Sequence, residues 1–282
     1  MSASVPATPR RVTSGPPLAY RLRMAAWYLP AVVVFVGTIA LWQLIVSNLE
    51  IRGFPLPAPS EIAKAFGENW DAGRWPLAKA AAATLFEALG GLVIGTVAGV
   101  VVALLTARFV TARELLMPLA IGASAVPIIA FAPLMNNWFG VLNPLSKMMI
   151  VAVLVFFPVV VNVTRGLTQV EPAALELMRS YAASEWTILR AVRIPNALPY
   201  FLTALKVSTT LSLIGAIVGE YFGGSSDVLG RVIVQSASAL RFDVTWAAII
   251  IGAATGIVMY LVIVAAERVI IPWHASVRAT EP

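Results

Sequence analysis

Six runs of mostly apolar residues constrain the fold of this sequence more than any other feature. A helix needs about 20 such residues to cross the hydrocarbon core of a bilayer, where backbone groups can bond only to one another. The runs lie at residues 27–46, 77–107, 115–135, 145–163, 199–219 and 246–271. Charged residues make up only 12% of the chain, which is about half their share in a soluble domain. We therefore predict an all-α integral membrane protein with about six transmembrane helices.

The distribution of lysine and arginine predicts which side of the membrane each loop faces, because the more basic loops stay in the cytoplasm. The segments on one side contain 12 of the 20 basic residues, and those on the other side contain seven. The more basic segments are residues 1–26, 107–114, 164–198 and 268–282. This asymmetry places both termini in the cytoplasm. It also accounts for the net charge of +6, so no nucleic-acid partner is needed to explain it.

Polar segments flank the apolar part of the chain. Residues 1–23 are rich in proline, serine and threonine and include four arginines, a composition typical of a disordered tail. The apolar run that follows is long enough to span a membrane, so we interpret this tail as retained and not as a signal peptide. We predict a membrane domain over residues 24–275, with a structured loop at 171–198 inside it, and a cytoplasmic tail at 276–282.

Side chains that carry out catalysis or bind metals are scarce. The chain has no cysteine and a single histidine, His274, which excludes thiolate metal sites and argues against histidine sites. It contains no phosphate-binding loop of the pattern Gly-x4-Gly-Lys-Ser/Thr. A membrane enzyme would need clustered carboxylates, histidines or an activated serine, and the sequence shows none. We expect no catalytic residue, no metal and no cofactor in this chain.

Residues 176–195 form a polar, basic and helix-forming stretch within a mostly apolar chain. Pro172 favours a helix start, and this helix is predicted to extend to about Ala183. Ser184 can then cap a second helix, which should end before Pro195 because proline disfavours helix in the preceding residue. Two short helices at a corner make a rigid element on which another protein can dock.

The spacing in this stretch resembles the coupling loop, or EAA loop, of bacterial ABC-importer permeases. The family pattern is Glu-Ala-Ala, three residues, Gly, nine residues and then Ile-x-Leu-Pro. Glu176 stands at the glutamate position, Ala182 at the glycine position and residues 192–195 at the end, while Leu177 and Met178 replace the two alanines. Alanine at 182 argues against the left-handed turn that glycine adopts at little cost, but not against close packing. The resemblance implies that the ATPase-coupling residues are Glu176, Ala182, Ala183, Ser184, Arg193 and Pro195.

The resemblance covers about residues 27–275 and is most specific to the nitrate/taurine/sulfonate-type branch. Segments at 54–60, 127–140 and 146–167 are similar to those of this branch. The resemblance implies a permease of the bacterial inner membrane without its own ATPase site. It also implies four kinds of partner: a cytoplasmic ABC ATPase dimer that binds ATP and Mg, an extracytoplasmic solute-binding protein, a second permease copy in a homodimer, and membrane lipid.

The substrate is left open between two groups of compounds. The branch handles nitrate, sulfonates and taurine, and also heterocyclic vitamins or precursors such as riboflavin and the thiamine pyrimidine. The segment at 131–140, Phe-Ala-Pro-Leu-Met-Asn-Asn-Trp-Phe-Gly, looks more like that of the heterocycle importers. A heterocyclic vitamin or precursor is therefore favoured, and a sulfonate, taurine or nitrate is the alternative.

Polar and helix-breaking residues in the predicted spans mark a candidate solute pathway. They are Pro127, Pro133, Asn136, Asn137, Lys206 and Glu220. Broken helices are tolerated where they line a cavity, and charged groups inside a bilayer are often functional. The plainer interpretations are kinked packing for the prolines, contact of Lys206 with the membrane surface, and a cap or salt bridge for Glu220. We also place Glu87 near the membrane surface and assign the glycines at 91, 95 and 99 to helix packing.

An ATP-independent secondary transporter or channel is the second hypothesis. Such a protein would favour internal sequence symmetry and buried ionisable relays, and it would need no docking loop. The six spans show no internal repeat. The importer permease is therefore preferred.

Overall fold

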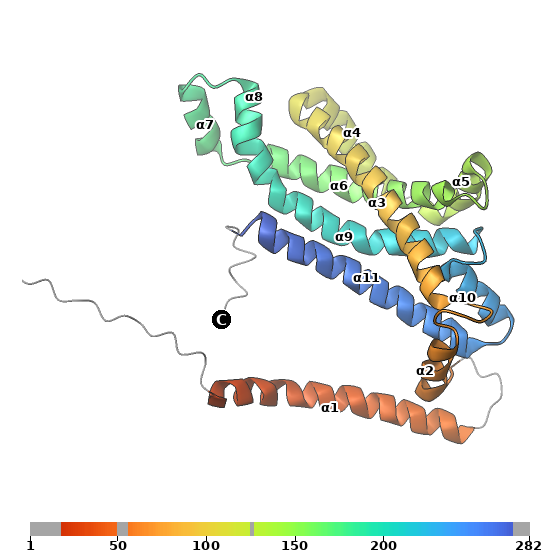
Figure 1. The fold of residues 1–282 in the computed structure, drawn as a ribbon. Helices are drawn as coiled ribbons and strands as arrows, with labels where there is room; N and C mark the ends of the chain where they lie inside the picture. Colours follow the sequence, from red (N-terminus) through yellow and green to blue (C-terminus); the bar gives the residue numbers. More distant parts are fainter. Residues whose placement is uncertain (1–17, 50–55, 125–126, 273–282) are drawn as a thin grey trace, which may run out of the picture. The chain divides into compact units, whose positions relative to one another are not determined.

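The computed structural model describes residues 18–49, 56–124 and 127–272, and every regular element in these residues is a helix, as the sequence predicts (Figure 1). The predicted tail at 276–282 lies outside them, as does most of the tail at 1–23. The boundary at residue 23 is wrong, since α1 already begins at Leu18. Residues 18–26 are mainly leucine, alanine, methionine and arginine, which are strong helix formers and extend the span backwards.

The helices are α1 Leu18–Leu49, α2 Pro59–Glu68, α3 Leu77–Arg108, α4 Val110–Ala123, η1 Ile128–Phe131, α5 Ala132–Phe139, α6 Pro144–Thr168, α7 Pro172–Ser180, α8 Glu185–Ile188, η2 Leu189–Arg193, α9 Ile194–Tyr221, α10 Leu229–Ser238 and α11 Phe242–Ile270. Five described helical segments are long and apolar enough to cross a membrane. They are Leu29–Asn48, Leu77–Arg108, Pro144–Thr168, Glu185–Tyr221 and Phe242–Ile270.

The predicted third span at 115–135 is not a single helix. α4 ends at Ala123, and a 3-10 turn (η1) and the short helix α5 follow. Each piece is shorter than the roughly 20 residues that a span needs. Pro127 and Pro133 account for the interruption, because proline lacks an N–H donor and restricts the residue before it. Pro133 lies in the first turn of α5, where a missing N–H leaves no helical bond unmade.

The chain divides into two compact units, residues 1–52 with 58–60 and residues 53–57 with 61–282. The first unit contains α1, and most of its apolar side chains between residues 29 and 48 are exposed within the unit, as is Trp27 at 81%. Such a surface suits a helix surrounded by lipid. In the same unit, Gln43 Nε2 donates to Ser60 Oγ at 3.1 Å, and Gln43 Oε1 accepts the Ser60 N–H at 3.0 Å.

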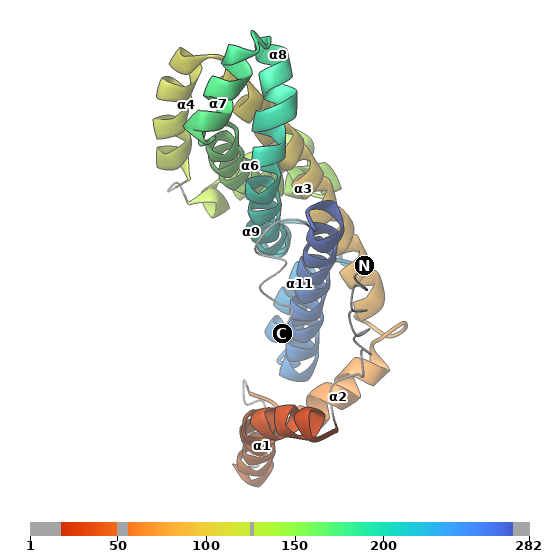
Figure 2. The same cartoon turned by 90° about the vertical axis from the view of Figure 1, so that its left-hand side faces the viewer.

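In the second unit, α3, α6 and α9 pack side by side around the main apolar core (Figures 1 and 2). Valines of α6 form its centre, and Val151, Val155 and Val159 are fully buried. α11 packs against α9, and α10 packs against α9, α11 and the beginning of α3. α10 therefore marks one end of the bundle, the end at which α3 begins and α9 finishes.

Three glycines allow α3 to approach α6 closely, which confirms the predicted packing role. A methyl group on Gly91 would lie 2.4 Å from Val151 Cβ, and one on Gly99 would lie 2.8 Å from Val159 Cγ1. At Gly95 the obstacle is backbone, because a methyl group there would lie 2.4 Å from the carbonyl oxygen of Ala152. At Gly91 a backbone atom is also close, because the carbonyl oxygen of Met148 would lie 2.5 Å from the methyl group. At both positions the added methyl group could be accommodated only if backbone moved.

Replacing Gly95 with alanine is expected to destabilise the protein by about 1–3 kcal/mol, because the added methyl group overpacks the α3–α6 contact. Gly122 on α4 is the matched control, since a methyl group there meets nothing within 4 Å. Gly122→Ala should be neutral or stabilising by up to about 1 kcal/mol, the gain in helix propensity. Thermal unfolding in lipid nanodiscs measures both, and equal melting temperatures for the two variants would contradict the packing role.

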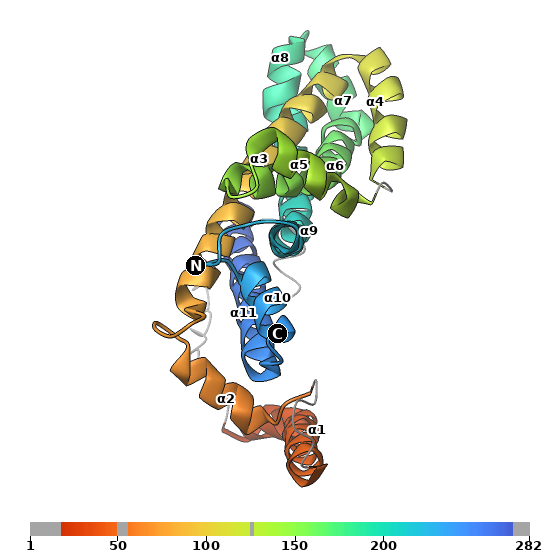
Figure 3. The ribbon, with the colours of Figure 1, turned by 90° about the vertical axis from the view of Figure 1, so that its right-hand side faces the viewer.

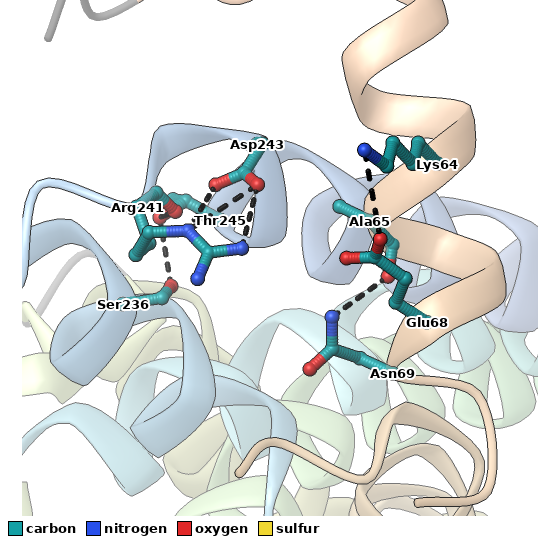
Figure 4. A network of polar contacts seen from close by, with 8 residues as sticks. All are labelled: Lys64, Ala65, Glu68, Asn69, Ser236, Arg241, Asp243 and Thr245. Atoms are coloured by element: carbon teal, nitrogen blue, oxygen red, sulfur yellow. Dashed lines mark hydrogen bonds and ion pairs between the residues drawn. The ribbon is translucent and has the colours of Figure 1, made fainter. Parts of the chain in front are cut away.

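A polar network holds the loop between α10 and α11 (Figure 4). The Arg241 guanidinium contacts the Asp243 carboxylate, with Nη2 2.8 Å from Oδ2 and Nε 3.0 Å from Oδ1. The hydroxyls of Ser236 and Thr245 lie 2.7 Å apart and join the two helices. Directly after α2, in the same view, Asn69 Nδ2 donates to the carbonyl of Ala65 at 2.9 Å. These bonds stiffen the surface at the α10 end of the unit.

Candidate functional site

The predicted coupling loop lies at the end of the bundle opposite α10, where α7 and α8 extend beyond α6 and α9 (Figures 1 and 3). All side chains of α7 are at least partly exposed, and Glu176 is among the exposed ones. Tyr181 and Trp186 are 75% and 68% exposed. Large aromatic side chains on an exposed surface are typical of a protein–protein contact. The loop therefore has the form of a docking element.

Ala182 adopts the left-handed conformation, with φ of 48°, so the expectation from its replacement of glycine is wrong. Its N–H donates to the carbonyl of Arg179 at 2.9 Å, and the N–H of Ala183 donates to that of Met178 at 3.0 Å. This pair of bonds is the Schellman end of a helix. The bonds satisfy carbonyls at the end of α7 and so offset the cost of about 1–2 kcal/mol for a non-glycine residue there.

Replacing Ala182 with glycine is expected to stabilise this turn by up to about 1 kcal/mol, because glycine removes the steric cost but loses more chain entropy. Amide exchange at Ala183 should slow by up to about fivefold, since its N–H closes the turn. Ala174→Gly, in the first turn of α7, is the control and should speed exchange, because glycine weakens a helix. Faster exchange in Ala182→Gly would contradict the left-handed turn.

Ser184 caps the second helix, as the sequence predicts. Its hydroxyl oxygen accepts the N–H of Thr187 at 3.2 Å. The helix does not end before Pro195, which is a second correction. α8 runs through a π-helical turn, η2, directly into α9. There the N–H of Ile194 donates to the carbonyl of Leu189, five residues back. The wider turn changes the bonding pattern just where proline brings no N–H, so the helix continues.

Two side chains, from η2 and from the start of α9, connect the loop to the ends of α3 and α6. Arg193 Nη1 donates to the carbonyl of Ala107 at 3.2 Å, in the last turn of α3. A cavity of about 300 Å³ lies beside this contact, with Glu185 and Trp186 in its lining. Asn196, which sequence reasoning missed, donates through Nδ2 to the carbonyl of Gly166 at 2.7 Å. These contacts tie the loop firmly to the membrane helices.

The six pathway candidates are not brought together in one site. Asn136 is buried in α5, and its Nδ2 donates to the carbonyl of Phe222 at 3.3 Å, close to the end of α9. Asn137 and both Pro127 and Pro133 are exposed. Glu220, at the same end of the bundle, accepts the N–H of Gly230 at 2.6 Å. Glu220 therefore caps α10, which is the plainer of its two interpretations.

Lys206 lies in the other half of α9 and forms an ion pair with Glu267 of α11, with Nζ 2.5 Å from Oε2. The side chains of the pair are 23% and 9% exposed. Glu267 lies in the last turn of α11, so the pair lies near one end of that span. The ion pair joins α9 to α11, as is usual for charged side chains within a membrane, which pair with one another.

Two charged side chains are more buried than the sequence indicates. Glu87, predicted near the membrane surface, is 5% exposed, and Lys147, counted with the loops, is fully buried in α6. Both lie at the α10 end of the bundle, and the sequence alone does not show which helices bury them. Among the described residues, no group of three or more His, Asp or Glu side chains is placed to hold a metal ion.

An apolar groove of about 530 Å³ runs between α9 and α11. Ile214 and Ile217 of α9 line one wall, and Gly252, Gly256 and Ile257 of α11 line the other. The small residues on α11 leave the groove open.

Residues 91–273, more than half of the chain, match the family described as binding-protein-dependent transport system inner membrane component. This chain belongs to that family. It is a multi-pass membrane permease subunit of an ABC importer, and the resemblance seen in its coupling loop is confirmed. The exposed loop at one end and the packed spans are therefore parts of one transport subunit.

Curated relatives match the permease over most of their length. It is 28% identical over 229 residues to a probable ABC transporter permease protein of Haemophilus influenzae, covering 81% of this chain and 91% of the relative. It is 27% identical over 238 residues to the riboflavin transport system permease protein RibX of Chloroflexus aurantiacus, covering 84% and 87%. It is 29% identical over 254 residues to the putative aliphatic sulfonates transport permease protein SsuC of Bacillus subtilis, covering 90% and 88%.

Proposed function

We propose that this permease imports a heterocyclic vitamin or vitamin precursor, such as riboflavin or the thiamine pyrimidine. The segment at 131–140 supports this choice through its likeness to the heterocycle importers, and one relative is named for riboflavin transport. A sulfonate, taurine or nitrate is the alternative, which the relative named for aliphatic sulfonates favours. In either case an extracytoplasmic solute-binding protein delivers the solute to the permease.

The observation that supports the coupling mechanism most is the continuity of α8 with α9. A cytoplasmic ABC ATPase dimer, with ATP and Mg bound to it, receives α7 and α8 in a cleft of each subunit. Closure of the ATPases then moves this loop, and α9 transmits the movement into the membrane because no flexible joint separates them. Repeated closure and opening give alternating access. Both chain termini lie in the cytoplasm in this arrangement.

Reconstitution in lipid vesicles tests the ATP-driven function directly. The permease is purified with and without its soluble ABC ATPase and supplied with the loaded binding protein. Uptake of radiolabelled solute should require the ATPase, ATP and Mg together. Uptake by the permease alone at the same rate would establish the ATP-independent transporter.

A second copy of the permease completes the solute pathway, and the α9–α11 groove is the surface we assign to this homodimer. The chain has no cysteine, so single cysteines can be introduced without background. Ile257→Cys places a thiol in the groove, where the native side chain is 59% exposed. Val97→Cys on α3, at the same exposure, is the control. Cross-linked dimers from Ile257→Cys alone would support this interface, and dimers from Val97→Cys alone would rule it out.

The substrate is tested on the cognate binding protein, which sets most of the specificity in such systems. A thermal-shift screen compares riboflavin and the thiamine pyrimidine with taurine, an alkanesulfonate and nitrate. We expect a heterocycle to raise the melting temperature, because a ligand that binds only the folded state stabilises it. If only a sulfonate, taurine or nitrate raises the melting temperature, the substrate is the alternative and not a vitamin.

A further inference from the structure

Three ionisable side chains meet inside the α10 end of the bundle. They are Glu87 of α3, Lys147 of α6 and Glu220 of α9, with exposures of 5%, 0% and 0%. The Glu87 and Glu220 side chains lie within hydrogen-bonding reach of each other, and Lys147 acts electrostatically on both. Buried charges persist only when they are paired and hydrogen-bonded. The partners of each group therefore decide which of them is charged.

Glu220 receives most of the hydrogen bonds. Its Oε2 accepts the N–H of Gly230 at 2.6 Å, at the start of α10. The hydroxyl of Thr84 also lies within reach of its carboxyl group, and the same hydroxyl oxygen accepts the Leu229 N–H at 2.9 Å. A helix N-terminus and several donors favour the ionised form of a carboxyl group. Lys147 has a separate bond, from its ammonium group to the carbonyl of Val141.

Two oxygens in this cluster lack a donor if both carboxyl groups are ionised. In the described part of the chain, Glu87 Oε2 and Glu220 Oε1 are buried without a hydrogen-bond partner. Two carboxylates can only accept, so neither can satisfy the other. One proton between them would supply the missing donor. It would also bring the summed charge of the two acids and Lys147 to zero. Double ionisation is disfavoured in any case, because two like charges in close contact repel each other.

We propose that Glu87 and Glu220 share one buried proton, which Glu87 carries and donates to the carboxylate of Glu220. The resulting bond fastens α3 to the end of α9, while Glu220 holds the start of α10 and balances Lys147. The site binds a proton as its ligand, and it does not depend on which solute is imported or on the coupling loop. Glu87 is a positioning residue, because its hydrogen bond holds the carboxylate of Glu220 in place.

Other titratable groups border the cluster. The phenol of Tyr221 on α9 interacts with Glu220. The stem of Arg231 on α10 packs beside Gly224, as does that of Lys147, at 3.5 and 3.8 Å from a methyl group built there. Lys79 Nζ donates to Asp227 Oδ2 at 2.6 Å, and this bond holds the pKa of Asp227 below its ordinary value. If Arg231 served as a second counter-charge, both glutamates would be ionised, and the protein would have no protonated carboxyl group at this cluster.

Infrared spectroscopy of the full chain in lipid nanodiscs tests the proposal, because only a protonated carboxyl group has the corresponding C=O stretching band. At neutral pH the wild type should show this band, and Glu87→Gln should lose it while keeping its melting temperature, since the amide still donates to Glu220. Glu68→Gln, on the exposed surface of α2, is the control and should leave the band unchanged. The absence of the band from the wild type would overturn the proposal.

Glu220→Gln provides a second, independent variant. The remaining acid, Glu87, must then ionise to balance Lys147, so the band should again disappear and the fold should survive. The double variant leaves Lys147 without a counter-charge, and its melting temperature should fall by more than the sum of the single changes. Additive changes in melting temperature, or a band that persists in both single variants, would show that these two acids share no proton.

Discussion

Glu176→Lys and Ala182→Asp are each expected to reduce ATP-driven uptake by about tenfold or more, which corresponds to a loss of about 1.4 kcal/mol of docking energy. Glu176 is exposed, so reversal of its charge alters the surface offered to the ATPase without disturbing internal contacts. Aspartate tolerates the left-handed conformation better than most residues. The Ala182→Asp variant should therefore keep the turn, at φ of 48°, while placing a charge on the docking surface.

Three measurements separate uncoupling from misfolding. Uptake and ATP hydrolysis are recorded in vesicles that contain permease and ATPase, and membrane insertion is recorded by the yield of folded permease. Ala182→Gly is the control and should retain full uptake, because it keeps the turn and adds no charge. Normal uptake in both Glu176→Lys and Ala182→Asp would show that this loop does not transmit the movement of the ATPase.

Removal of one partner of the Lys206–Glu267 pair is expected to destabilise the permease by about 3 kcal/mol, because it leaves a largely buried charge uncompensated. The two atoms are 2.5 Å apart and join α9 to α11. Lys206→Met and Glu267→Gln should each lower the melting temperature. The double variant should recover most of the loss, since neither charge then remains inside the helix bundle.

The exposed pair Lys64–Glu68 is the control for this prediction. Its side chains are 77% and 55% exposed and its atoms are 3.8 Å apart. Lys64→Ala should change the stability by less than about 1 kcal/mol, as is usual for surface pairs. If Lys206→Met has an equally small effect, the ion pair contributes little. If the double variant is as unstable as either single one, packing and not charge pairing holds α9 to α11.

Local patterns were sufficient for the parts of the coupling loop that depend on neighbouring residues. The Ser184 cap was predictable because its hydroxyl precedes the first turn of a helix, where N–H groups lack a helical partner. The structure confirms it with the bond from the Thr187 N–H. For Ala182 and Pro195 the sequence-based predictions are wrong, because the intrinsic preference of a residue is only one contribution to the local free energy. Two hydrogen bonds outweigh the steric cost at Ala182, and a π-helical turn accommodates Pro195.

The third predicted span shows the limit of hydropathy. The run at 115–135 is apolar enough to span a membrane, but the structure divides it into α4, η1 and α5. Hydropathy measures whether side chains tolerate lipid, whereas a span also needs an unbroken backbone ladder. The prolines within the run were visible in the sequence, and they were the signal that the helix would break.

The sequence by itself determined the all-α membrane class, most of the spans and the position of the docking loop, because these follow from apolar run length, charge placement and residue spacing. Only the tertiary structure decided the partners of the charged groups. It paired Lys206 with Glu267, and it buried Glu87 and Lys147 beside Glu220. These residues lie on different helices, and periodicity along one helix shows which face is apolar but not which distant helix supplies a counter-charge.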